Sequence, residues 1–410
     1  MGFISWLRYR TANRAARQRK QRRAEPPSFR PQLESLENRI VPSFSSPHSI
    51  PDAAVVMVAA DLTGNGKTDF VGGGGYSVVV LMAGKKAGTF NAPVPFQTGY
   101  QVTSIAVGDI NNDGKPDIVV GEGEEDGATF GDPGFISVLL GNGNGGFGLP
   151  VNFDAGSPPA SRVALADLNG DGLLDIVTDH SVLLNSNSLI ALMNQGNPFG
   201  IGWVPQDYNF VAENGLALGD LNGDGRPDIV AMGDSNQIQV WLNNGTGGFT
   251  AGQQVFEGGA YHPLPPFVFD NAVALGDVNG DGKLDVVMAN GTSNSVSVFA
   301  GNGDGTFNTT TAQTYAVGGA VYAVALGDFN KDGKLDIATT GAQMNVLLNN
   351  GAGGFGTAQQ VGPAGSTLVV GDFNGDGFPD LAQNDASSAI IDVLLDDAAG
   401  QTTGHKGHKG

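Results

Sequence analysis

The amino-acid sequence predicts an all-β fold, a seven-bladed β-propeller built from four-stranded blades. A nine-residue segment, Asp-x-Asn-x-Asp-Gly-x-x-Asp or a close variant, occurs seven times, beginning at Asp61, Asp109, Asp167, Asp220, Asp277, Asp328 and Asp372. These copies are 48, 58, 53, 57, 51 and 44 residues apart, a period expected of a propeller, solenoid or repeat array. Short apolar runs flank every copy, and no stretch beyond residue 45 has apolar residues at helical spacing.

Each copy of the segment is predicted to connect two strands. An apolar run such as RVALAD or AVALGD precedes it, and an apolar residue follows its ninth position every time. A third strand is predicted after the next turn, at residues 137–140, 239–242, 295–299 and 345–348. A glycine-rich turn ending in phenylalanine then leads into a fourth strand. Four short strands in each repeat are the content of a propeller blade.

The seventh repeat ends after its third strand, so its fourth strand must come from elsewhere. Phe44 precedes Asp61 by 17 residues, which is the spacing between Phe355 and Asp372. We therefore expect residues 44–50 to form the outer strand of blade seven beside residues 390–396, which would leave no open sheet edge. The propeller would then span residues 44–396.

The repeated segment carries the oxygen donors that a hard divalent cation requires. Positions one, three, five and nine offer carboxylate, amide or hydroxyl oxygens, and the main-chain carbonyl of position seven could add another. Position six is glycine in all seven copies, which permits the positive φ that turns the chain around an ion.

One such copy would be explained by an Asx-rich turn without a metal, whereas seven in register favour calcium, up to seven ions. The expected ligands are Asp61, Thr63, Asn65, Asp69, Asp109, Asn111, Asp113, Asp117, Asp167, Asn169, Asp171, Asp175, Asp220, Asn222, Asp224, Asp228, Asp277, Asn279, Asp281, Asp285, Asp328, Asn330, Asp332, Asp336, Asp372, Asn374, Asp376 and Asp380. No copy has glutamate at position 12, so the segment is not an EF-hand loop. The first copy holds only two carboxylates, Asp61 and Asp69, and we expect it to bind most weakly.

The seven segments, together with the Gly-Gly-Phe or Gly-Thr-Phe turns, resemble the FG-GAP/VCBS repeat family, whose calcium-loop blades also occur in integrin α-subunit propellers. This resemblance covers roughly residues 44–396. It implies that each segment is the hairpin between the first and second strands of a blade, so that all ions lie on one face. It also implies that partners bind the opposite face, which is formed by the connections between blades.

The charge is divided unequally along the chain. The whole chain carries −20, whereas residues 1–45 carry ten Lys or Arg against three Glu, so the remainder carries −27. Twenty of the acidic residues lie in the seven repeated segments. A body this acidic argues against nucleic acid as a partner. The chain has no cysteine, which excludes disulfides and thiolate chemistry.

The N-terminal segment is basic, and its apolar start is too short to span a membrane. RPQLESLENRIVPS at residues 30–43 resembles the N-terminal segment of planctomycete-type extracellular proteins, which implies that residues 1–43 are associated with export. A solvated basic tail is the alternative. We expect a monomer that acts at the cell surface or outside the cell, with residues 397–410 as a disordered polar tail.

Three functions remain open from the sequence, because a fold by itself does not decide function. The resemblance favours a calcium-binding module that binds or adheres to a glycan or protein. The alternatives are a polysaccharide-cleaving enzyme on the same disc and a structural surface or matrix protein. We expect no enzyme, since the acidic cluster that begins at Glu122 is predicted to be a solvated hairpin and no Ser/His/Asp set is visible.

Aromatic residues outside the repeated pattern are the candidates for contact with a ligand. Exposed rings on loops suit sugar faces and protein hot spots. The alternative is that these rings cover the rim of the core. The candidates are Trp203, Tyr208, Tyr261, His262 and Tyr315.

Overall fold

The computed structural model describes residue 44 and residues 48–51, 56–123, 134–156, 160–180, 188–196, 204–208, 215–233, 237–256, 272–351, 353–385 and 390–396. These residues all belong to one unit, residues 41–410. Three predictions fall outside the described residues: the export role of residues 1–43, the disordered tail at 397–410, and the candidate ligand residues Trp203, Tyr261 and His262.

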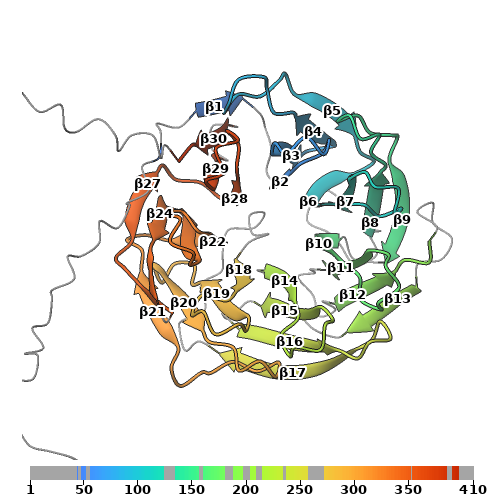
Figure 1. Cartoon of the computed structure of the whole chain (residues 1–410). Helices are drawn as coiled ribbons and strands as arrows, with labels where there is room; N and C mark the ends of the chain where they lie inside the picture. Colours follow the sequence, from blue (N-terminus) through green and yellow to red (C-terminus); the bar gives the residue numbers. More distant parts are fainter. Residues whose placement is uncertain are drawn as a thin grey trace, which may run out of the picture. The chain divides into compact units, whose positions relative to one another are not determined.

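Seven four-stranded antiparallel sheets stand in a ring in this unit, with the first strand of each repeat innermost (Figure 1). The all-β, seven-bladed propeller predicted from the sequence is therefore confirmed. The described parts of the chain contain no helix that is long and apolar enough to cross a membrane.

The first four blades are formed by consecutive strands. Blade one contains β2 (Val56–Ala60), β3 (Asp69–Gly74), β4 (Ser77–Leu81) and β5 (Val94–Gln97). Blade two contains β6 (Gln101–Gly108), β7 (Asp117–Gly123), β8 (Gly134–Leu139) and β9 (Val151–Gly156). Blade three contains β10 (Ala160–Ala166), β11 (Asp175–His180), β12 (Ser188–Met193) and β13 (Val204–Tyr208). Blade four contains β14 (Gly215–Gly219), β15 (Asp228–Gly233), β16 (Gln237–Asn243) and β17 (Phe249–Phe256).

The remaining three blades include the exceptions to this order. Blade five contains β18 (Val273–Gly276), β19 (Asp285–Ala289), β20 (Ser295–Phe299) and β21 (Gln313–Ala316). Blade six contains β22 (Val321–Gly327), β23 (Asp336–Gly341), β24 (Met344–Leu347) and β27 (Gln359–Gly362), and its turn holds the short pair β25 (Asn349–Gly351) and β26 (Gly354–Phe355). Blade seven contains β28 (Leu368–Gly371), β29 (Asp380–Asp385), β30 (Ile390–Leu394) and β1 (His48–Pro51).

Blade seven joins the two ends of the described chain. Strand β1 pairs antiparallel with β30, from His48 opposite Val393 to Pro51 opposite Ile390. Phe44 forms a further isolated bridge with Asp396. The outer edge of β30 is therefore covered by a strand that precedes blade one in the sequence.

Burial follows the position of each strand within its blade. The second strands β7, β15, β19 and β23 are buried at every residue, because a neighbouring blade covers each face of the sheet. The outer strands β5 and β21 are largely exposed. Each of these second strands therefore begins with apolar residues directly after its aspartate, as in DIVV, DIVA and DVVM.

The core consists of apolar layers between adjacent blades. One cluster joins blades one and two through residues such as Val71 and Ile118, and others continue around the ring. The layer between blades seven and one contains Phe70 and Phe373, whose ring centroids lie 4.4 Å apart. Because every blade contributes to two layers, the ring is one continuous packing unit.

Candidate metal loops and a candidate ligand groove

All seven repeated segments lie between the first and second strands of their blades, as hairpin loops on one end of the sheets. We number them loops one to seven. The position-six glycine has φ between 77° and 86° in every loop, a region that glycine alone adopts without strain. Position four also has positive φ in every loop, from 53° to 78°, and there Asn112 and Lys331 replace glycine. The positive φ at position four is not part of the prediction from the sequence, although glycine at this position in five loops indicates it.

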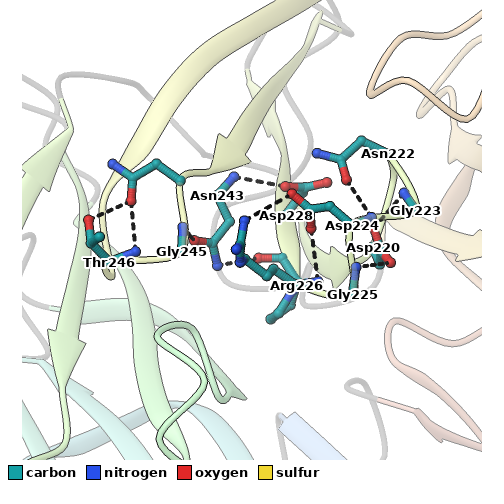
Figure 2. A network of polar contacts seen from close by, with 12 residues as sticks. Asp220, Asn222, Gly223, Asp224, Gly225, Arg226, Asp228, Asn243, Gly245 and Thr246 are labelled. Carbon is teal, nitrogen blue, oxygen red and sulfur yellow. Dashed lines mark hydrogen bonds and ion pairs between the residues drawn. The ribbon is translucent and has the colours of Figure 1, made fainter.

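The side chains at positions one, three and five accept hydrogen bonds from the loop's own backbone. The position-one carboxylate accepts the N–H of position six at 2.7–2.8 Å and the N–H of position five at 2.9–3.1 Å in all seven loops. The position-three asparagine accepts the N–H of position five in the six loops that have it. Figure 2 shows this arrangement in loop four, around Asp220, Asn222 and Asp224. The side chains of these positions therefore point into one small volume enclosed by the loop.

The position-nine aspartates have a different environment. All seven are fully buried, with no exposed surface. One carboxylate oxygen accepts the N–H of position two at 2.8–3.1 Å. The other accepts, at 2.6–2.8 Å, the N–H of a residue that ends the third strand or lies within two residues of its end. Position nine therefore fastens each loop to the third strand of its own blade.

Burial changes the acidity of these aspartates. It raises the pKa of Asp117 and Asp175 to about 6 and the pKa of Asp336 and Asp380 to about 7, although the backbone donors oppose the shift. The carboxylates at positions five and one of the same loop raise these pKa values further. Burial and the nearby carboxylates thus both oppose ionisation of the position-nine aspartate in these loops, and a cation would offset the repulsion.

The loops fit a hard cation by the chemistry of their donors. In loop one, Thr63 occupies position three, and its buried hydroxyl oxygen has no hydrogen-bond partner. Among the described residues, no three Asp, Glu, His or Cys side chains converge closely enough to hold a metal ion by themselves. The expected set also includes amide, hydroxyl and main-chain oxygens, and its carboxylates here accept backbone N–H groups instead. An ion would therefore compete with those hydrogen bonds at positions one, three and five.

Basic residues at position seven neutralise part of the loop charge. Lys115, Arg226 and Lys334 lie 3.1, 3.4 and 2.8 Å from the position-five aspartates of their own loops. These pairs are exposed, so each contributes little to stability. They leave the position-five carboxylate accessible to a competing cation.

Tyr315 is the one ligand candidate whose side chain the structure describes. It lies in β21, where its ring packs against Phe355 of blade six with centroids 5.3 Å apart. Its hydroxyl donates to Gln313 Oε1 and lies 3.3 Å from the Gly353 carbonyl oxygen. Tyr208 lies at the end of β13. Tyr315 was expected on a loop, and the structure places it in an outer strand because the fourth strand of blade five extends to Ala316.

A groove of about 470 Å³ runs along the outer side of the ring between blades five and six. Tyr315 and Phe355 supply its aromatic surface, while Gln343, Asn345 and Gln360 supply amide groups. None of its lining residues is charged. The sequence pattern does not indicate Phe355 or the amides, because Phe355 belongs to the repeat consensus, and the tertiary structure brings Asn345 of β24 and Gln360 of β27 to the same groove. The groove suits an uncharged ligand that combines a flat apolar face with hydrogen-bonding groups.

Glu122 corrects one expectation from the sequence. It was assigned to a solvated acidic hairpin, yet it is fully buried in β7, where its carboxylate accepts the N–H of Tyr100 at 3.1 Å. Burial raises the pKa of Glu122 to about 7, against the hydrogen bonds of Ser137, Tyr100 and Gly99. Glu122 is still part of the ladder, opposite Val102 of β6 and Phe135 of β8, and this places it inside the sheet and not in the solvated turn beyond it.

Comparison with known proteins agrees with the repeat structure. The family model for the FG-GAP-like repeat matches residues 43–120, 123–178, 220–287 and 277–339, and the model for the FG-GAP repeat matches residues 102–139 and 364–382. No curated protein matches the chain.

Two solved structures share the fold, and both are crystal structures of BBS1N in complex with ARL6DN. The mercury-soaked one is 11% identical, with a TM-score of 0.57, over 88% of this chain and 98% of that one. The lead-soaked one is 13% identical, with a TM-score of 0.56, over 87% of this chain and 98% of that one. Propellers are common ligand-binding modules, and FG-GAP repeats are typical of extracellular proteins. Since the repeat matches cover more than half of its length, the chain belongs to the FG-GAP repeat family.

Proposed function

We propose that the chain is an exported calcium-binding propeller that binds or adheres to a glycan or protein ligand at the cell surface or outside the cell. The observation that carries this proposal is the repetition of one oxygen-rich loop in all seven blades, each with its acidic side chains around a single small volume. Millimolar calcium outside cells suits loops of this kind, because extracellular modules bind at ~10⁻⁴–10⁻³ M.

The residues at positions one, three and five would hold the ion, together with the main-chain carbonyl of position seven and the position-nine carboxylate. A bound divalent cation supplies positive charge that offsets the repulsion among these carboxylates. In the first loop only Asp61 and Asp69 are acidic, so it is the weakest site. The role proposed for calcium is therefore structural, since it keeps the loops of the ring in one conformation.

The groove between blades five and six is the proposed ligand site. Its uncharged lining accommodates a neutral sugar or an uncharged protein segment despite the acidity of the surrounding body. Stacking on Tyr315 and hydrogen bonds to the amides of Gln343 and Gln360 would provide contact and specificity. No proposed partner is a nucleic acid, because the acidic body repels phosphate.

We propose no catalytic activity for the chain. The acidic candidate Glu122 is buried and engaged with the Tyr100 N–H, so it is not positioned to meet a polysaccharide. A polysaccharide-cleaving enzyme or a structural matrix protein are the alternatives that an assay must separate from a binding module.

A glycan array probed with the purified chain, with and without calcium, tests the proposal. We expect calcium-dependent retention that Tyr315→Ala reduces at least about ten-fold, by loss of a stacking aromatic. Tyr76→Ala is the matched control, because Tyr76 is 48% exposed and lies outside the groove. A melting temperature that chelator leaves unchanged would contradict the calcium role, and cleavage of array glycans would favour the enzyme.

A further inference from the structure

The residue at the end of the third strand whose N–H reaches the position-nine aspartate differs between blades. It is Asn194, Asn243 and Asn349 in blades three, four and six, and it is Gly141 and Gly301 in blades two and five. In all five blades its backbone N–H donates to the position-nine aspartate of the same blade. The asparagines have in addition a side-chain amide, which reaches beyond their own blade.

Asn243 connects two neighbouring loops. Its Nδ2 donates to the Leu168 carbonyl of loop three at 2.8 Å and to the Pro227 carbonyl of its own loop at 3.0 Å. Its backbone N–H donates to Asp228 at 2.8 Å, and its Oδ1 accepts the Gly245 N–H at 2.8 Å (Figure 2). The side chain is only 4% exposed, so these bonds are made without competition from water.

The same pattern occurs at the other two asparagines. Asn194 donates to Ile110 of loop two at 2.8 Å and to Leu174 of its own loop at 3.0 Å. Asn349 donates to Val278 of loop five at 2.7 Å and to Leu335 of its own loop at 2.9 Å. The acceptor in the preceding loop is position two in all three cases. Repetition of the pattern shows that it is a property of the blade type.

Position two of the preceding loop is thereby held from both sides. The Leu168 N–H donates to Asp175, the position-nine aspartate of loop three, at 2.9 Å, while the Leu168 carbonyl accepts from Asn243. Asn243 in turn is bonded to Asp228 of loop four. A continuous path of hydrogen bonds thus leads from one position-nine aspartate to the next, and it repeats from loop two to loop three through Asn194.

The glycine blades interrupt this side-chain path. A Cβ on Gly301 would stand 2.1 Å from the Leu284 carbonyl oxygen, and one on Gly141 would stand 2.0 Å from the Pro116 oxygen, so no side chain fits there. At the junction of blades four and five, the Leu221 carbonyl accepts the backbone N–H of Gly305 at 3.1 Å instead. Gly305 lies in the glycine-rich turn, whereas the residue bonded to the position-nine aspartate of this blade is Gly301.

We propose that Asn194, Asn243 and Asn349 are positioning residues that couple neighbouring calcium loops. Loops two, three and four form one cooperative set, loops five and six form a second, and Gly301 separates the two. When calcium orders one loop, the position-two carbonyl of that loop is held in place. This carbonyl in turn holds the asparagine and the position-nine aspartate of the next loop before that loop binds its own ion. This proposal rests on the proposed function, because it concerns how calcium is held.

The test measures calcium bound to the full chain by equilibrium dialysis over a range of free calcium. Asp171→Ala removes a position-five ligand from loop three. In the parent chain, we expect it to remove that ion and also to weaken loop four about five-fold, the effect of roughly one net hydrogen bond. In the Asn243→Ala background, Asp171→Ala should remove the loop-three ion alone.

Two controls separate coupling from general damage. Asn244→Ala changes the next residue of the same turn, whose side chain bonds only to Thr246 and Gly248 among its described contacts, and it should preserve the coupling. Across the glycine junction, Asp224→Ala and Asp281→Ala should weaken binding additively. Alanine is tolerated at the asparagine position in this fold, since Ala83 occupies it in blade one. If Asn243→Ala does not fold, Asn349→Ala tests the same coupling between loops five and six.

The outcomes are distinguishable. Loss of coupling in Asn243→Ala with coupling retained in Asn244→Ala supports the proposal. Equal coupling in the parent and in Asn243→Ala overturns it while leaving the proposed function intact. A parent chain that binds no calcium at millimolar concentration overturns the proposed function and this proposal with it.

Discussion

Ile50 lies directly opposite Ile391, in the antiparallel pair that β1 forms with β30. These two residues are separated by almost the whole propeller in sequence, and their pairing closes the ring. The strand that precedes blade one therefore completes blade seven, and Phe44 extends the contact through its bridge to Asp396.

Removal of β1 should open the ring. We compare a chain that starts at Ser43, which retains β1, with one that starts at Asp52, which lacks it. Loss of the strand exposes the edge of β30, so the shorter chain should melt about 5 °C or more lower and aggregate with increasing concentration. Differential scanning calorimetry and light scattering measure both effects. Equal melting temperatures and equal monomer content in the two chains would contradict this closure.

Positions five and nine of one loop should respond differently to substitution. Asp228→Ala leaves the buried N–H groups of Leu221 and Asn243 without acceptors and should lower the free energy of unfolding by about 3 kcal/mol even in chelator. Asp224→Ala changes an exposed residue and should lower the free energy of unfolding by no more than about 0.5 kcal/mol in chelator. The decrease should be larger in calcium. Urea unfolding under the two conditions measures both. If the two variants lose equal stability in chelator, the structural role assigned to position nine is wrong.

Glu122 should make the stability of the protein depend on pH. Burial raises the pKa of Glu122 from its ordinary value of 4.5 to about 7 in the folded protein. The contribution of this side chain to the free energy of unfolding is therefore full below the unfolded pKa, and it is lost as the pH rises through about 7. Glu122→Gln removes the charge and should stabilise the protein by about 2 kcal/mol at pH 8 relative to the parent, with no such gain at pH 4. Melting curves of the pair from pH 4 to 8 give this difference. A difference that is constant with pH would refute the assignment.

The position-six glycines are required for backbone conformation and not for space. Gly225 has φ of 82°, and a Cβ there would meet no atom within 4 Å. Gly225→Ala should nevertheless cost about 1–2 kcal/mol, because an L-residue is strained in this region. Gly148→Ala is the control, since its backbone has no positive φ and its nearest neighbour would be an ordinary contact at 3.7 Å. Chemical denaturation of both variants should show a loss only for Gly225→Ala.

The sequence by itself determined the number and type of blades. The seven segments from Asp61 to Asp372 each need a strand on either side, and the spacing leaves room for two more strands between copies. Glycine at position six marks a hairpin, because no other residue adopts its φ without strain. These are local properties of the chain, so they are visible in one repeat and reinforced by repetition. The calcium ligands and the ligand partner stay predictions.

Only the tertiary structure decided how similar residues divide their roles. Asp224 and Asp228 are both carboxylates of one motif, yet Asp228 is buried. Its carboxylate accepts the backbone N–H of Asn243, which belongs to the third strand. The glycine-rich turn likewise has two adjacent asparagines that the sequence does not distinguish. Asn243 donates to Leu168 of the preceding blade, whereas Asn244 bonds within its own turn. The acidic residues next to Glu122 predict a solvated position for it, whereas it is fully buried in β7. Such differences arise from contacts between segments that are far apart in sequence, and a local pattern of residue types cannot encode them.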